Sequence, residues 1–230
     1  PPEYDAFRTQ PGLQKVELWN GNTAWLATRY EDVRALLNDN RFSADPRKAG
    51  YPHIAPGRDR EKREDLPFFV MMDQPDHTRY RRLLTKEFTV SRIKALQAVV
   101  EKITEDLVDE LVAGGREADA VEQFALPLPT RMIAEMMGVP YADHGFFQDR
   151  TTKILAVDGP PGETLSAGDD MRRYITELLH EKAKAPRDHD DLMGRFIVDQ
   201  LEPGNTTYEE AAMLMVMLLL AGHETTANMT

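Results

Sequence analysis

An acid and an alcohol stand side by side near the end of the chain, in residues 221–225, which read A-G-H-E-T. A carboxylate such as Glu224 next to a hydroxyl such as Thr225 can hand protons to a bound ligand. In a helix, the Thr225 hydroxyl can also turn back onto the carbonyl of Ala221. With no side chain at Gly222, the segment predicts a notch for a small ligand. The alternative is a buried helix that turns polar as it reaches the surface.

The helix that must carry this segment has its own start signal. Thr206 with Glu209, and Thr207 with Glu210, both have the spacing of a capping box, in which hydroxyl and carboxylate satisfy the free N–H groups of a helix start. Residues 211–222 then read A-A-M-L-M-V-M-L-L-L-A-G. A helix that is apolar all round has to be covered by protein on every face, and a membrane span needs about 20 apolar residues. We therefore predict a buried central helix.

Hydrophobic spacing predicts the other elements. An Asn-Gly step between two apolar runs predicts a hairpin around residues 20–22. The first twelve residues and residues 45–66 are expected to be irregular. Helices are expected from Pro75 onward and over residues 30–38, 91–113, 129–137, 142–157, 166–184 and 190–201. The predicted class is mainly α, with a small N-terminal β hairpin.

The helix that starts at Pro75 brings two donors to one face, because His77 and Arg81 are four residues apart. A histidine ring N–H and the planar guanidinium of arginine both bind carboxylates. The pair therefore predicts a receptor for an anionic group. The alternative is a surface salt-bridge cluster with acids such as Asp73.

Other faces of the same helix carry Arg79, Arg82 and Lys86, which make a basic patch on an acidic chain. A solvated helix face is the plain explanation. The functional one is docking of an acidic electron-transfer partner, because opposite charges speed encounter.

Composition limits the functions to consider. The 230 residues are 41% hydrophobic with a net charge of -11 and no cysteine, which predicts one sizeable domain in a cytoplasmic setting. The acidic balance argues against nucleic acid as a partner. Motifs of phosphate-binding loops, zinc hydrolases and serine hydrolases do not occur in the sequence. A helical enzyme without them has to take its chemistry from a cofactor.

Residues 221–226, A-G-H-E-T-T, resemble the oxygen-binding segment of the distal helix in cytochrome P-450 monooxygenases. Residues 77–82, H-T-R-Y-R-R, resemble helix C of that family, and residues 25–43 its first hairpin and helix B. The resemblance implies the cytochrome P-450 fold, of the bacterial type without a membrane anchor. It also implies a haem-dependent monooxygenase that inserts one oxygen atom from dioxygen into a small-to-medium apolar organic substrate.

The resemblance implies roles for individual residues. The catalytic residues would be Thr225 and Glu224, which deliver protons. Haem b would be bound by His77 and Arg81 at its propionates and by Phe88, Ala221 and Gly222 beside the ring. The apolar substrate pocket would be lined by Met217, Leu220 and Ala221. Electrons would come from an iron–sulfur ferredoxin or a similar partner, and the protein is expected to be a monomer that binds no membrane.

One feature of that family is missing from these residues. The family holds the haem iron with a cysteine thiolate, and the chain has no cysteine. We therefore expect the metal ligand to lie beyond Thr230, and residues 1–230 to be the N-terminal portion of a single cytochrome P-450 domain. Two other functions stay open: a haem-thiolate enzyme that uses peroxide, and a haem-free helical module that binds a ligand.

Overall fold

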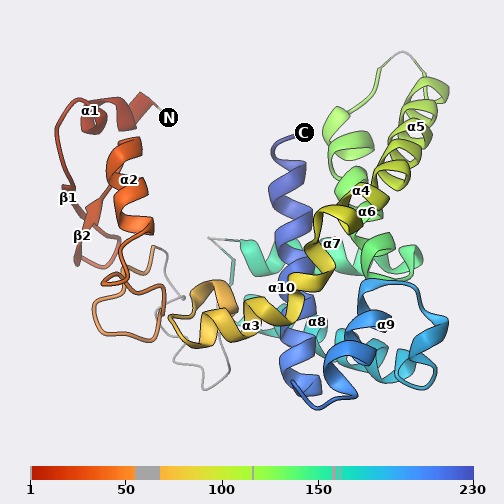
Figure 1. The fold of residues 1–230 in the computed structure, drawn as a ribbon. Helices are drawn as coiled ribbons and strands as arrows, with labels where there is room; N and C mark the ends of the chain where they lie inside the picture. Colours follow the sequence, from red (N-terminus) through yellow and green to blue (C-terminus); the bar gives the residue numbers. More distant parts are fainter. Residues whose placement is uncertain (1, 55–67, 116, 157–158, 161) are drawn as a thin grey trace. The chain divides into compact units, whose positions relative to one another are not determined.

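The fold is mainly helical (Figure 1). It is seen in a computed structural model that describes residues 2–54, 68–115, 117–156, 159–160 and 162–230, without the side chains of Glu3 and Glu224. The chain divides into two compact units, Pro1–His77 and Thr78–Thr230. Within the described part of the chain, no helix has both the length and the apolar character that a membrane crossing requires.

The first unit contains the predicted hairpin. Strands β1 (Gln14–Glu17) and β2 (Thr23–Leu26) pair antiparallel, with Val16 opposite Ala24. Gly21 has a φ of 78° in the connection, a conformation that glycine adopts without strain. The prediction of a hairpin is therefore confirmed.

The other elements of this unit are short. They are a 3-10 turn at Pro2–Tyr4, α1 (Asp5–Arg8), α2 (Tyr30–Leu37) and a 3-10 turn at Phe69–Met71. The prediction of an irregular lead-in was wrong at α1, where Arg8 bonds the Asp5 carboxylate at 2.6 Å. Residues 45–54 form no helix or strand, as expected, while residues 55–66 lie outside the described residues.

In its described part the second unit consists of helices joined by loops and turns. Its helices are α3 (Asp76–Leu84, which begins at the end of the first unit), α4 (Val90–Ala95), α5 (Gln97–Ala113), α6 (Pro127–Met137), α7 (His144–Leu155), α8 (Glu163–Lys182), α9 (Leu192–Phe196) and α10 (Tyr208–Ala227). Short 3-10 turns lie at Thr85–Phe88, Tyr141–Asp143 and Pro186–Asp188, and π turns at Val121–Ala125 and Ile197–Leu201. The predicted helices are found, but residues 91–113 divide into α4 and α5, and residues 190–201 into α9 and a π turn.

Helix α10 runs through the middle of this unit, with α6 and α8 packed against it (Figure 1). All of residues 211–220 are buried except Leu218, which is half-buried. The prediction of a buried central helix is confirmed for these turns. It was wrong for Ala221, which is exposed because the last turns of α10 leave the packed part of the unit.

The start of α10 confirms one of the two predicted capping boxes. The Glu210 N–H donates to Thr207 Oγ1 at 3.2 Å, and the Thr207 N–H donates back to Glu210 Oε2 at 3.3 Å. The box between Thr206 and Glu209 was wrong, because the Thr206 hydroxyl donates to Glu210 Oε2 at 2.8 Å. The Glu210 carboxylate therefore accepts hydrogen bonds from both Thr206 and Thr207.

A buried ion pair joins the ends of α6, α8 and α9. Lys182 Nζ lies 2.5 Å from Asp191 Oδ2, with side chains only 7% and 13% exposed. Asp191 also caps α9 by accepting from the Gly194 N–H at 2.9 Å. Gly138 ends α6 with a φ of 71°, and a Cβ there would lie 2.0 Å from Asp191 Oδ2 and 2.6 Å from Lys182 Nζ. Glycine is therefore required at position 138 by both conformation and space.

We predict that Gly138→Ala strongly destabilises the protein. The left-handed conformation costs an alanine about 1 kcal/mol, and displacing one partner of a buried ion pair costs about 3–5 kcal/mol more. The measurement is the free energy of unfolding in urea. The matched control is Gly204→Ala, because Gly204 has a similar φ of 74° and nothing within 4 Å of its missing Cβ. Equal losses for the two variants would contradict the role of the ion pair.

Candidate functional site

The motif segment keeps its helical form, and its threonine is bonded as expected. The Thr225 hydroxyl donates to the carbonyl oxygen of Ala221, four residues earlier. A hydroxyl has one proton and two lone pairs, so the Thr225 oxygen can still accept a hydrogen bond. In this state the proton of Thr225 is held by the backbone.

One face of the last turns of α10 is open. Ala221 and Thr225 are exposed and Leu218 is half-buried, and steps of three and four residues place all three on one side of a helix. This open face, defined by Leu218, Ala221 and Thr225, presents a small side chain beside a hydroxyl. The side chain of Glu224, predicted as the proton donor to Thr225, lies outside what the structure describes.

Gly222 serves the packing of α10 against α6. A Cβ at this position would lie 3.0 Å from Ile133 Cδ1, closer than nearly all real contacts of that kind. The predicted notch at Gly222 is therefore wrong in the chain as described, because Ile133 fills the space. Its assignment as a haem-binding residue remains a prediction.

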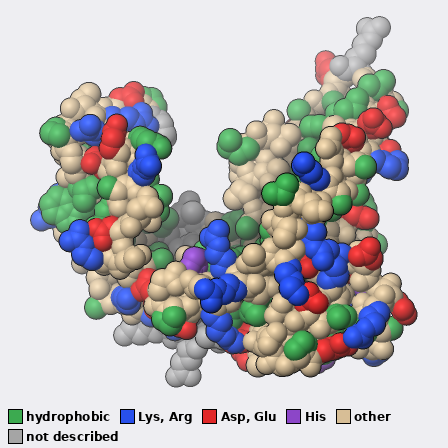
Figure 2. Space-filling view, in the orientation of Figure 1, with side chains coloured by type: hydrophobic (Ala, Val, Ile, Leu, Met, Phe, Trp, Pro, Cys, Tyr) green, Lys and Arg blue, Asp and Glu red, His purple; other side chains and the backbone are tan. Residues whose placement is uncertain are grey.

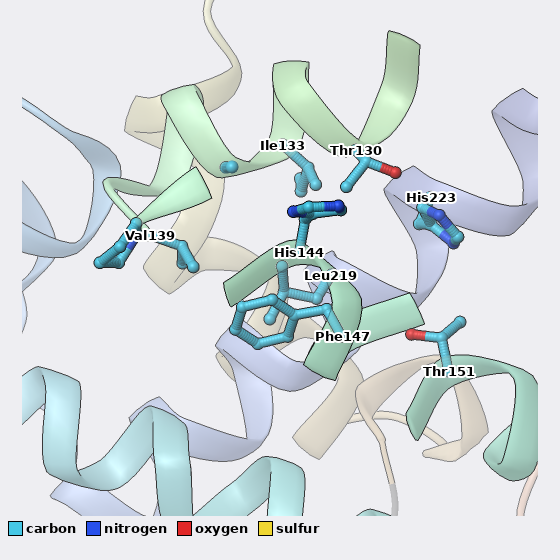
Figure 3. Close-up of a pocket in the computed structure, with 10 residues that line it drawn as sticks. Thr130, Ile133, Val139, His144, Phe147, Thr151, Leu219 and His223 are labelled. Carbon is cyan, nitrogen blue, oxygen red and sulfur yellow. The ribbon is translucent and has the colours of Figure 1, made fainter. Parts of the chain in front are cut away.

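On the side of α10 away from the open face, His223 borders a pocket between α6, α7 and α10 (Figure 3). Its empty volume is about 340 Å³, part of it open to solvent. Thr130, Thr151 and His223 are the polar residues of its wall that are buried, and His144 reaches it from α7 with Nδ1 2.9 Å from the Tyr141 carbonyl. Sequence spacing gave no signal for this pocket, because its wall comes from three helices.

Helix α3 carries the predicted anion receptor. Gln74 Nε2 lies 3.3 Å from His77 Nδ1. In the tautomer in which Nδ1 accepts from this amide, the ring proton is on Nε2 and can be donated to an anion. Arg81 is exposed and makes no ion pair with any residue that the structure describes. Phe88, 43% exposed, ends the 3-10 turn that follows α3.

The alternative was a surface salt-bridge cluster of His77 and Arg81 with acids such as Asp73, and among the described residues Asp73 forms its ion pair with Lys48 instead. The Asp73 carboxylate bonds Lys48 Nζ at 2.5 Å, the Ser43 hydroxyl at 2.6 Å and the Ala44 N–H at 3.0 Å. These donors, Lys48 foremost, lower the pKa of Asp73 to about 2. Asp73 is therefore engaged elsewhere than with the two donors of α3.

The predicted basic patch of Arg79, Arg82 and Lys86 contains fewer unpaired cations than the sequence suggested. Figure 2 shows Lys and Arg side chains gathered over this part of the chain. Two of them are paired, since Arg79 bonds Glu210 and Lys86 bonds Asp199 at 3.0 Å. Arg82, like Arg81, has no ion pair within the part of the chain that the structure describes.

Comparisons with known proteins cover the whole chain. Cytochrome P450-SU2 from Streptomyces griseolus is 42% identical over 226 residues, which are 98% of this chain and 54% of that protein. Vitamin D3 dihydroxylase from Streptomyces griseolus is 39% identical over 231 residues, 100% of this chain and 56% of that protein. The crystal structure of the mycinamicin VIII C21 methyl hydroxylase MycCI from Micromonospora griseorubida, bound to mycinamicin VIII, superimposes with a TM-score of 0.89 at 32% identity, over 99% of this chain and 57% of that one. No protein-family model matches the chain.

Over the part that this chain covers, the fold is the one seen in solved cytochrome P450 structures. The chain belongs to the cytochrome P450 family, and it spans about half the length of the curated relatives it matches.

The residues present fit the haem that this family implies. A haem is a flat apolar ring with two carboxylates, and Arg81, which is exposed and makes no ion pair with any described residue, is a guanidinium that can bind one of them. The open face of α10 offers a small side chain and a hydroxyl to the ring. Within the described residues no group of His, Asp and Glu side chains is arranged to hold a metal ion.

The predicted substrate residues have different surroundings. Met217 and Leu220 are buried, at 7% and 8% exposure, whereas Ala221 lies on the open face. Their roles remain predictions.

Glu210, at the start of α10, is a carboxylate that accepts hydrogen bonds from both α3 and α10. It accepts from Arg79 Nη1 and Nη2 at 2.8 and 2.9 Å and from the Tyr80 hydroxyl at 2.7 Å. Thr206 and Thr207 complete its shell. These donors, Arg79 foremost, lower the pKa of Glu210 from 4.5 to about 2.

We predict that this carboxylate makes stability depend on acid pH. Because its pKa is lowered on folding, its contribution is complete above about pH 4.5 and is lost as the pH falls toward 2. At pH 7, Glu210→Gln should lower the free energy of unfolding by about 2 kcal/mol, and the difference from the natural protein should shrink at pH 3. Urea unfolding at the two pH values measures it.

The matched control is Glu202→Gln, which removes an exposed pair with Arg187 and should change stability little at either pH. A difference for Glu210→Gln that is unchanged between pH 7 and pH 3 would contradict the prediction.

Proposed function

We propose that the natural protein that contains this chain is a haem-dependent monooxygenase. It inserts one oxygen atom of dioxygen into a small-to-medium apolar organic molecule. The observation that carries the proposal is the open face of α10, where the Thr225 hydroxyl stands beside the small side chain of Ala221. Likeness to cytochromes P450 over the whole chain supports it.

In this proposal His77 and Arg81 hold the two propionates of haem b, iron protoporphyrin IX. Arg81 contributes its planar fork and His77 the N–H of Nε2. Phe88, Ala221 and Gly222 lie along the ring, Gly222 through its backbone because Ile133 occupies its side-chain space. When bound, the haem supplies the activation of dioxygen, with electrons arriving one at a time.

Thr225 acts as the proton-handling group of the open face. At rest its proton is bonded to the Ala221 carbonyl, so its oxygen faces a ligand as an acceptor. Rotation about χ1 releases the proton and makes the hydroxyl a donor. Glu224, the adjacent acid, replenishes that proton.

The substrate class is an apolar molecule that Ala221, Leu220 and Met217 contact. One relative is named for vitamin D3 and another for mycinamicin VIII, so substrates differ among proteins similar to this chain. The electron donor we propose is an iron–sulfur ferredoxin with an acidic surface, which docks near Arg82, a cation without an ion pair among the described residues.

We predict that the natural protein shows a haem absorption band that is strongly red-shifted when the reduced protein is treated with carbon monoxide.

In the double variant His77→Ala, Arg81→Ala, haem content after gel filtration should fall several-fold, because both propionate donors are lost. The haem-to-protein absorbance ratio measures it.

The matched control is Arg82→Ala, which removes the neighbouring exposed arginine and should leave haem content unchanged. A colourless natural protein would contradict the function, and in that case a haem-free binding module would be favoured. Full haem content in the double variant would contradict only the roles of His77 and Arg81.

Thr225→Ala should retain haem and substrate binding but divert reducing equivalents to hydrogen peroxide. The methyl group of alanine can neither hold nor donate the proton, so product formed per electron pair should fall by about tenfold. Thr225→Ser should restore most of the coupling, and Thr226→Ala, at an exposed neighbouring threonine, should leave it unchanged. Product and peroxide are measured together, and a fully coupled Thr225→Ala enzyme would overturn the assignment.

A further inference from the structure

A single carboxylate links α3 to α10. Glu210 bonds Arg79 and Tyr80 of α3, and at the same time Thr206 and Thr207 at the start of its own helix. We call Glu210, Arg79 and Tyr80 the Glu210 cluster, and we treat the bonds with Thr206 and Thr207 as the cap of α10. Figure 1 shows α3 crossing α10 in the half of α10 that contains its start.

The Glu210 cluster connects α3 to α10 through hydrogen bonds that are largely shielded from water. The Glu210 side chain is only 14% exposed, and Tyr80 is 3% exposed. Arg79 donates from both terminal nitrogens to the two oxygens of Glu210, a geometry that fixes direction as well as distance. The lowered pKa of Glu210 keeps the carboxylate ionised at any neutral pH. These hydrogen bonds hold α3 at one rotation about its axis and at one position along it, relative to the start of α10.

This rotation decides where Arg81 points. Successive residues of a helix turn by about 100°, so Arg81, two residues after Arg79, lies on nearly the opposite side of α3. With Arg79 held by Glu210 and Tyr80 buried, Arg81 is exposed. Arg81 therefore lies on the side of α3 away from the bond between Arg79 and Glu210.

The other end of the link is the open face of α10. Ala221 and Thr225 follow Glu210 by 11 and 15 residues in one helix without a break, which is about 17 and 22 Å at about 1.5 Å per residue. The Glu210 cluster is thus the point from which both the propionate donor and the open face are placed.

We infer that Glu210 is a positioning residue that sets Arg81 of α3 in register with the open face of α10 for haem binding. The inference rests on the proposed function. The competing explanation is that Glu210 merely caps α10, which its bonds with Thr207 would achieve alone.

The chain offers variants that separate the two explanations. Arg79→Gln and Tyr80→Phe remove bonds to α3 and leave the cap intact. Thr207→Ala removes a bond of the cap and leaves the bonds to α3. In the natural protein with haem bound, the rate of haem transfer to apomyoglobin measures the placement of the propionate donors, and thermal unfolding measures stability.

We expect Arg79→Gln to lose haem about tenfold faster, and Tyr80→Phe less so, as for substitutions along a coupling network. Thr207→Ala should lower the melting temperature but lose haem at the natural rate. Arg79→Lys, which restores a charge, should recover part of the effect.

Equal rates of haem loss in Arg79→Gln, Thr207→Ala and the natural protein would overturn the inference while the function stands. The inference would also be overturned if the rate of haem loss of every variant were explained by that variant's melting temperature. If Arg79→Gln fails to fold, Tyr80→Phe, which loses one hydroxyl, decides the matter in the same assay. A natural protein that contains no haem overturns the proposed function, and with it this inference.

Discussion

A helical segment without a polar side, residues 211–220 of α10, has to be covered all round, and the second unit is organised by that constraint. Residues 211–220 of α10 offer water no favourable face, so α6 and α8 pack against them and leave only Leu218 half-buried. Burial of these side chains stabilises the unit by about 25 cal/mol for each Å² removed from water. Every other feature of the unit has to accommodate this central helix.

Close packing around α10 leaves little room at particular points. Gly222 lets Ile133 of α6 approach, and Gly138 lets the ion pair of Lys182 and Asp191 close the corner between three helices. Both glycines act by the absence of a Cβ, but for different reasons: the first admits a methyl group, and the second admits a charged pair while adopting a left-handed conformation. Buried charges are tolerated at the corner because each is paired and hydrogen-bonded.

The last turns of α10 have two different sides, because a helix that leaves its packed surroundings is covered unevenly. On one side Ala221 and Thr225 are exposed, and on the other His223 is buried against a pocket formed with α6 and α7. The difference between the sides is set by which neighbours reach the last turns. In α3, Arg79 bonds Glu210, whereas the exposed Arg81 makes no ion pair with any residue that the structure describes.

The sequence by itself determined what depends on neighbours within a few residues. It predicted the hairpin at Gly21, the capping box of Thr207 with Glu210, the bond from Thr225 to Ala221 and the shared face of His77 and Arg81, because turns, caps and helical spacing act over four residues or fewer. The resemblance of its motifs to those of cytochromes P450 also predicted the family.

Only the tertiary structure decided which partners meet across the fold. Glu210 reaches Arg79 and Tyr80, 131 and 130 residues away, and Ile133 fills the space beside Gly222. Three helices assemble the pocket at His223. Spacing along the chain does not predict such contacts. They depend on how the apolar faces of the helices pack together, and polar groups pair where that packing brings them close.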